Sequence, residues 1–206
     1  MKIECIPSGV LRANSYLAFD EETKKGFIVD PGGFEQKMID EIEKNGCSIE
    51  YIILTHGHGD HIGGVPEYKE KLPGVKLLAA ETEVPLLADV VLNESRMCAG
   101  RELVLKPDVT VTDGETLEIG GMTLKFIMTP GHTPGGMCIL AGDVLFSGDT
   151  LFCRSIGRTD FPGGSFREIM ESIREKLLVL PEETRVLPGH MGPTTVGEEK
   201  RENPFV

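Results

Sequence analysis

THGHGDH, at residues 55–61, is the most informative stretch of this sequence. It holds three of the five histidines of the 206-residue chain. It begins where an apolar run, IEYIILT at residues 49–55, predicts a buried strand. The end of a strand is held rigidly by its sheet, and the loop beyond it can present side chains for binding or chemistry. The position therefore predicts a functional loop.

The spacing within this stretch suits metal binding. In an extended turn, His56 and His58 point the same way and can share one metal ion. Asp60 and His61 come later and can face a neighbouring ion. Neutral imidazole and carboxylate are ligands that zinc prefers, and they also suit iron and manganese. Two glycines are expected to supply the backbone angles that such a crowded turn requires, namely Gly57 and Gly59.

The other two histidines stand in settings that match each other. His132 lies in TPGHT (residues 129–133) and His190 lies in LPGH (residues 187–190). Each directly follows Pro-Gly at the end of an apolar run. A lone histidine in such a place is ordinarily a turn residue. Two in matching places, in a chain that also carries THGHGDH, indicate further metal ligands.

One aspartate completes this set. Asp149 follows the apolar run at residues 144–146 and lies in SGDT, and we interpret it as a carboxylate that bridges metal ions. Without the histidines, an aspartate after glycine would be a turn or helix-capping residue. Three other aspartates fall in turns or lack this context and are set aside, namely Asp30, Asp143 and Asp160.

The composition excludes several classes of protein. With 33 acidic and 21 basic residues, the formal charge of −12 argues against a nucleic-acid partner and against docking on an anionic membrane. No apolar run is long enough to span a bilayer, and the N-terminus lacks the apolar core of a signal peptide, so we expect a cytoplasmic protein. Five widely spaced cysteines form neither a disulfide framework nor a zinc motif, namely Cys5, Cys47, Cys98, Cys138 and Cys153.

Strand and helix patterns alternate in both halves of the chain. Helices are expected at residues 34–45, 62–72, 83–98 and 165–180. Strands are expected at residues 1–6, 14–19, 26–29, 49–55, 75–80, 109–112, 116–119, 122–128, 137–141, 144–147 and 184–187. No linker separates the halves, which predicts a layered α/β sandwich formed by one domain over residues 1–206.

Two segments near the C-terminus carry specific expectations. The last predicted helix has an apolar stripe that should face the core, made of Phe166, Ile169, Met170, Ile173, Leu177 and Leu180. The charged run EEKRE at residues 198–202 is expected to be a solvated surface segment.

The motifs THGHGDH, TPGHT, SGDTLF and LPGH, in this order over residues 55–190, resemble those of the metallo-β-lactamase superfamily. Within it, the sequence is most similar to glyoxalase II-like (hydroxyacylglutathione hydrolase-like) proteins. GDTLFCRSIGRTDFPGG, at residues 148–164, also resembles a stretch of the persulfide dioxygenases. The resemblance implies an α/β fold in the form of a four-layer αββα sandwich, with a metal site at one edge of the two sheets.

The resemblance also implies a ligand set for two divalent cations. The first would be held by His56, His58 and His132, and the second by Asp60, His61 and His190. Asp149 would bridge them, at a position where many true β-lactamases of this fold have cysteine. Zinc is the first choice of metal, with iron or manganese as alternatives.

The chemistry expected of such a site is hydrolysis. Metal binding brings the pKa of water from about 15.7 to about 7, which makes a metal-bound hydroxide available at neutral pH. Asp60 would accept a hydrogen bond from this nucleophile and orient it. The metals would stabilise the oxyanion, and a thioester suits the site because thiolate leaves readily. Together with this chemistry, the glyoxalase II resemblance implies a small acyl-thiol such as S-lactoylglutathione as the substrate.

Residues 150–167 bear on which thiol carries the acyl group of the substrate. They contain three arginines and one aspartate, which suggests a local positive spot that could bind glutathione. The glyoxalase II resemblance implies that Arg158 binds a substrate carboxylate. Alternatively, Arg158 pairs with Asp160, which stands where that family has tyrosine. Only sixteen residues follow His190, so the helical C-terminal domain of full-length glyoxalase II is expected to be absent. A different acyl thiol, a lactone or a small ester therefore stays open.

Three hypotheses follow. The first is a binuclear thioester hydrolase. The second is a mononuclear iron persulfide dioxygenase, in which His56, His132 and Asp149 would hold the iron. The third is a non-catalytic metal-stabilised binding protein, which the complete set of seven candidate ligands argues against. The sequence does not indicate an oligomeric state.

Overall fold

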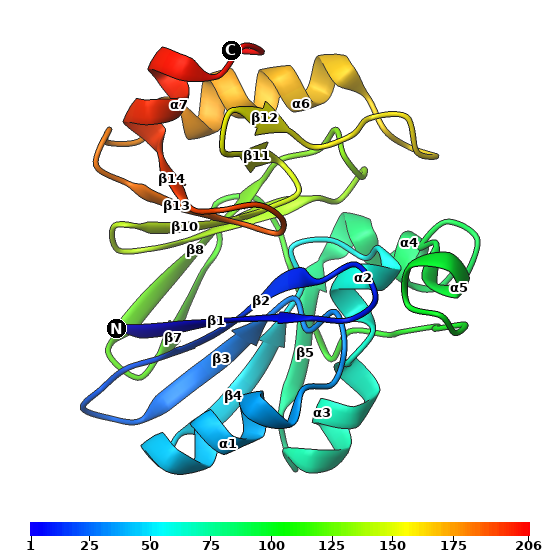
Figure 1. Cartoon of the computed structure of the whole chain (residues 1–206), viewed down its shortest axis with the longest axis vertical. Coiled ribbons are helices and arrows are strands. Elements are labelled where there is room, and N and C mark those ends of the chain that lie inside the picture. The colour runs from blue at the N-terminus through cyan, green and yellow to red at the C-terminus, as the bar shows by residue number, and fades with distance from the viewer.

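Two six-stranded sheets pack face to face, with helices on both outer surfaces (Figure 1). The computed structural model describes all residues, 1–206. The layers run helix, sheet, sheet, helix, which confirms the predicted αββα sandwich. None of the helices combines the length and the apolar run that crossing a bilayer requires.

The first sheet is formed by the N-terminal half of the chain. Its strands follow chain order: β1 (Lys2–Ser8), β2 (Ala13–Phe19), β3 (Lys25–Val29), β4 (Ser48–Ile53), β5 (Lys76–Ala80) and β6 (Val109–Val111). The first three pair antiparallel, and pairing is parallel from β3 onward. The outer face is covered by α1 (Gln36–Asn45) and α3 (Val65–Lys71). The short α2 (Gly59–Ile62) directly follows the loop after β4.

The second sheet is formed by the C-terminal half. Its order is β14 (Thr194–Thr195), β13 (Arg185–Pro188), β10 (Val144–Gly148), β9 (Met137–Ala141), β8 (Met122–Met128) and β7 (Thr116–Ile119). The outer face carries α7 (Val196–Glu202) and α6 (Phe166–Ser172), which continues as a π-helical turn over Ile173–Leu177. A small hairpin, β11 (Leu151–Phe152) and β12 (Ser155–Ile156), lies between β10 and α6 in the chain.

Three apolar clusters hold the four layers together. In β3, Phe27 and Val29 face the other sheet, whereas Ile28 faces the outer helices. Successive side chains of a strand point to opposite faces, so a strand buried on both sides reads as a continuous apolar run. Between the sheets, the Phe146 ring meets Tyr16 edge-on at 5.4 Å. The third cluster lies between the second sheet and α6.

The predicted helix at residues 83–98 is wrong. The structure has a 3₁₀ turn (Glu81–Glu83), α4 (Val84–Leu87) and α5 (Ser95–Cys98), with irregular chain between α4 and α5. The Asn93 side chain donates to the Leu103 carbonyl at 2.8 Å, and Glu94 has a positive φ of 53°. Hydrogen bonds from side chains to the backbone compete with a helix, and here they prevail.

Other expectations need smaller corrections. The helix expected at 62–72 is divided into α2 and α3 at Gly63 and Gly64. Phe166 was expected in the core but is 57% exposed, whereas Ile169 and the next three stripe residues are buried. The run at 198–202 belongs to α7 and is not simply solvated, because Glu199 is completely buried.

Candidate metal centre

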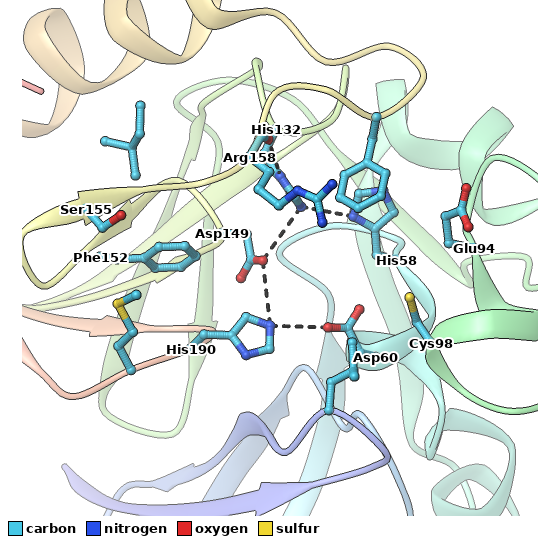
Figure 2. Close-up of a pocket in the computed structure, with 14 residues that line it drawn as sticks. His58, Asp60, Glu94, Cys98, His132, Asp149, Phe152, Ser155, Arg158 and His190 are labelled. Atoms are coloured by element: carbon cyan, nitrogen blue, oxygen red, sulfur yellow. Dashed lines mark hydrogen bonds and ion pairs between the residues drawn. The ribbon is translucent and has the colours of Figure 1, made fainter.

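The structure brings all seven predicted metal ligands together. Each comes from a loop or short helix that follows a strand, namely β4 for His56, His58, Asp60 and His61, β8 for His132, β10 for Asp149 and β13 for His190. Figure 2 shows five of these side chains converging on one pocket. The strand ends of both sheets thus meet at one site.

The first cluster consists of His56, His58 and His132, whose ligand atoms all lie within 4.8 Å of one another. His58 Nδ1 lies 2.9 Å from His132 Nε2. On the other side of its ring, His132 Nδ1 donates a hydrogen bond to the Arg158 carbonyl at 2.6 Å. Because a carbonyl only accepts, this bond fixes the proton on Nδ1 and leaves Nε2 free to bind a cation.

The second cluster consists of Asp60, His61 and His190, which also lie within 4.8 Å of one another. Asp60 Oδ2 is 3.2 Å from His190 Nε2 and 3.7 Å from His61 Nε2. His61 Nδ1 donates to Asp30 Oδ2 at 3.0 Å, which leaves His61 Nε2 facing the cluster.

Setting Asp30 aside was therefore wrong. Its side chain is buried and also accepts hydrogen bonds from the Thr55 backbone N–H at 2.7 Å and the Thr55 hydroxyl at 2.5 Å. Asp30 directly follows β3, just as Asp149 directly follows β10. The same strand-end context could therefore have identified it.

Asp149 lies between the two clusters. Its Oδ1 is 3.4 Å from His61 Nε2, and its Oδ2 is 3.6 Å from His132 Nε2 and 3.7 Å from His190 Nε2. Gly189 leaves room for this arrangement, since a Cβ there would lie 2.3 Å from Asp149 Oδ1. One carboxylate therefore faces ligand atoms of both clusters.

The donor set fits divalent cations. Four polar atoms of the site are buried without a hydrogen-bond partner: His56 Nε2, His58 Nε2, His61 Nε2 and Asp149 Oδ1. Buried polar atoms are nearly always satisfied, so several such atoms in one place need an explanation. Bound cations would satisfy those that face the clusters, and imidazole nitrogen with carboxylate oxygen suits zinc, iron and manganese.

The electrostatics differ between the clusters. Burial, with the nearby His132, lowers the pKa of His58 to about 3, so this ring is neutral at pH 7 and able to bind a cation. Burial also disfavours protonation of His61, but the surrounding carboxylates, led by Asp149 and Asp60, raise its pKa to about 10. A cation in the second cluster would therefore replace a proton on His61.

The glycines of THGHGDH serve packing. Neither Gly57 nor Gly59 has a positive φ, so the expectation that they supply special backbone angles is wrong. A Cβ on Gly57 would lie 2.7 Å from Leu86 Cδ2, and one on Gly59 would lie 2.5 Å from the Ser95 Cα. The absence of side chains lets the loop lie directly against α4 and α5.

Glu83 has a part in the site that no sequence pattern indicated. Its buried carboxylate accepts hydrogen bonds from the Gly57 N–H at 2.9 Å and the Gly135 N–H at 2.8 Å. Burial raises its pKa to about 7. One side chain thus joins the loop of His56 and His58 to the loop of His132.

A pocket of about 350 Å³ opens above the two clusters. Arg158 lines it, but both guanidinium contacts to Asp160 are short, at 2.8 and 2.9 Å. The other two arginines of the expected positive spot are also paired, Arg154 with Glu202 and Arg167 with Glu171. Among the cysteines, Cys98 lines the pocket.

Comparisons with known proteins agree with this geometry. Residues 8–190 match the family model of the metallo-beta-lactamase superfamily. The chain is 40% identical over 209 residues to the probable metallo-hydrolase YqgX of Bacillus subtilis, covering 100% of this chain and 98% of that protein. It is 35% identical over 210 residues to the hydroxyacylglutathione hydrolase GloC of Haemophilus influenzae, with the same coverage.

Solved structures give the same result. The BLEG-1 B3 metallo-beta-lactamase superposes with a TM-score of 0.91 at 38% identity, covering 99% of both chains. TTHA1623, in a di-iron-bound form, gives a TM-score of 0.84 at 33% identity, covering 98% of this chain and 100% of that one. ETHE1 from Myxococcus xanthus gives 0.82 at 28% identity, covering 99% of this chain and 84% of that one. Because the family model matches most of the chain and relatives at 35–40% identity cover all of it, the chain belongs to the metallo-β-lactamase superfamily.

Proposed function

We propose that this protein is a binuclear thioester hydrolase that acts on a small acyl-thiol, for which S-lactoylglutathione is the reference substrate. The observation that carries the proposal is the position of Asp149 between two clusters of three ligand atoms each, in an open pocket. The likeness to GloC, whose name states a hydroxyacylglutathione hydrolase, supports this substrate class. Zinc is the proposed metal, with iron as the alternative that the di-iron structure of TTHA1623 supports.

The role proposed for each residue follows from where it lies in the site. The first cluster would hold one cation, the second cluster another, and Asp149 would contact both. When bound, the cations supply an acidified water and positive charge for the carbonyl oxygen. Asp60 is placed to accept a hydrogen bond from the attacking water and orient it, because its carboxylate lines the pocket.

No protein nucleophile is needed. Cys98 lines the pocket, but burial, with the nearby Asp60, raises the pKa of its thiol to about 11. The thiol therefore stays protonated at neutral pH, and the thiolate is the reactive form. The substrate's own sulfur leaves as a thiolate, so hydrolysis needs only water, the carboxylates and the bound cations.

Metal analysis combined with turnover tests the proposal. Purified protein is expected to hold two divalent metals per chain, to hydrolyse S-lactoylglutathione or another acyl thioester, and to take up no oxygen with glutathione persulfide. One iron per chain with oxygen uptake would instead establish the persulfide dioxygenase that residues 148–164 resemble.

A matched pair of variants separates catalysis from folding. Asp60→Asn is expected to abolish turnover and leave the thermal unfolding transition cooperative. Asp143→Asn changes an exposed aspartate in the turn between β9 and β10 and is the control that should keep full activity. Persistent turnover in Asp60→Asn would show that the proposed orienting role is wrong.

A further inference from the structure

Part of the pocket lining is apolar, and we call this part the apolar wall. It is formed by four side chains from three separate segments, namely Leu11, Phe152, Ile156 and Met191. Phe152 lies beside His190 and Asp149, on the side of the pocket away from Glu94 and Cys98 (Figure 2). Leu11 and Met191 are 52% and 59% exposed, so large apolar surface faces solvent at the mouth. Apolar surface lining a pocket favours an apolar ligand group.

The rest of the pocket offers no free positive charge. Arg158 is its one cationic lining residue, and Asp160 pairs with it through both carboxylate oxygens. The guanidinium also lies 4.4 Å from the Phe161 ring centroid. Glu94 also lines the pocket and adds a carboxylate. A substrate that brings its own carboxylates, as glutathione does, finds no unpaired partner here.

We propose that the apolar wall receives an uncharged acyl chain and that the site favours thiol carriers without carboxylates. This rests on the proposed thioester hydrolysis. In a thioester with a polar carrier, the acyl chain is the apolar part, and Phe152 lies next to the ligands where the carbonyl must react. The preferred substrate class is therefore a medium-chain acyl thioester of an uncharged thiol.

Acyl chain length tests the wall. The probes are N-acetylcysteamine thioesters with acetyl, butanoyl, hexanoyl and octanoyl groups, assayed with the metal-loaded protein. We expect kcat/KM to rise by about two- to fourfold per added methylene until the wall is covered. Leu11→Ser should reduce the hexanoyl-to-acetyl ratio. Val10→Ser is the matched control, because Val10 is also exposed, at 63% against 52% for Leu11, and lies in the same hairpin but does not line the pocket.

The preference for thiol carriers without carboxylates is tested by varying the charge of the carrier. With the same acyl group, the N-acetylcysteamine thioester should be hydrolysed with higher kcat/KM than the glutathione thioester. Asp160→Asn frees Arg158 and should improve the glutathione thioester selectively, by about two- to fivefold at low salt, because this exposed charge is screened by ions.

The outcomes separate the two proposals. If no thioester is hydrolysed, the proposed function is wrong. If short thioesters are hydrolysed but kcat/KM is flat with chain length and Leu11→Ser matches Val10→Ser, the acyl wall is wrong while the hydrolase stands. If glutathione thioesters are preferred and Asp160→Asn changes nothing, the claim about carrier charge is wrong.

Discussion

The carboxylate of Asp30 lies 3.0 Å from Nδ1 of His61, and both side chains are completely or almost completely buried. The contact joins the end of β3 to α2 across 31 positions of the chain. It fixes the orientation and the tautomer of His61, a buried histidine whose Nε2 faces both Asp60 and Asp149. A partner of this kind normally makes a histidine a better metal ligand.

Asp30→Asn should therefore weaken metal binding without removing any proposed ligand. The charge that supports His61 is lost, and we expect metal affinity at the second cluster to fall by about 10- to 100-fold. Competition with a chromophoric chelator measures this directly. Asp40→Asn, on the exposed face of α1, is the control. Equal affinities for the two variants would contradict the assignment.

Glu83→Gln should loosen the link between two ligand-bearing loops. Each carboxylate oxygen of Glu83 accepts one backbone N–H, whereas glutamine has one acceptor and would turn its NH₂ toward a donor. We expect a loss of about 1–3 kcal/mol in unfolding free energy. The visible spectrum of the cobalt-substituted protein should also change, because the loop of His132 shifts relative to that of His56. An unchanged spectrum would limit Glu83 to a stabilising role.

Glu83 also predicts a pH dependence of stability. Burial raises its pKa to about 7, above the 4.5 of an exposed glutamate. Between these values the folded state keeps a proton that the unfolded state has lost, so the contribution of Glu83 to stability decreases as pH rises through this window. The slope is at most about 1.4 kcal/mol per pH unit. Denaturant unfolding near pH 5 and near pH 7.5 should show wild type losing stability relative to Glu83→Gln, and parallel behaviour would refute the prediction.

Removing metal should destabilise the fold. Without cations, Asp60 and Asp149 lie close together, and buried polar atoms of the site stay unsatisfied. A cation that binds only the folded state adds about 4 kcal/mol when present at a thousand times its Kd. Treatment with a chelator should lower Tm, and added zinc, manganese or iron(II) should restore it. A Tm that does not respond to metal would contradict binding at these clusters.

Glu199 should stabilise the C-terminal helix from within. Its buried carboxylate accepts hydrogen bonds from the Arg154 N–H at 2.9 Å, the Thr194 hydroxyl at 2.6 Å and the Asn203 amide at 2.7 Å. Glu199→Gln should cost about 1–3 kcal/mol of unfolding free energy, because it places a donor among donors. Glu202→Gln, which removes an exposed ion pair with Arg154, should cost at most about 1 kcal/mol in the same denaturant titration.

Local patterns in the sequence were enough to predict the main strands and the amphipathic helix that begins near Ser165. They were also enough to pick out the seven side chains that cluster in the structure. Hydrophobic periodicity reports which face of an element is buried, and it depends only on neighbouring residues. The motifs at strand ends identified the residues of the metal centre, because the strand ends of both sheets meet at one edge of the sandwich. The predicted strands accordingly match the observed ones closely, whereas the 83–98 helix failed where side chains bind the backbone.

Tertiary structure alone decided what surrounds those side chains. Asp30 meets His61 across 31 positions and Glu83 meets Gly135 across 52, and no local pattern encodes such contacts. The pairing of Arg158 with Asp160 was one of two possibilities in the sequence, and the folded loop selected it. The apolar wall gathers residues from three segments far apart in the chain. Hydrogen bonds and packing between distant segments depend on the folded coordinates, which periodicity within single elements does not specify.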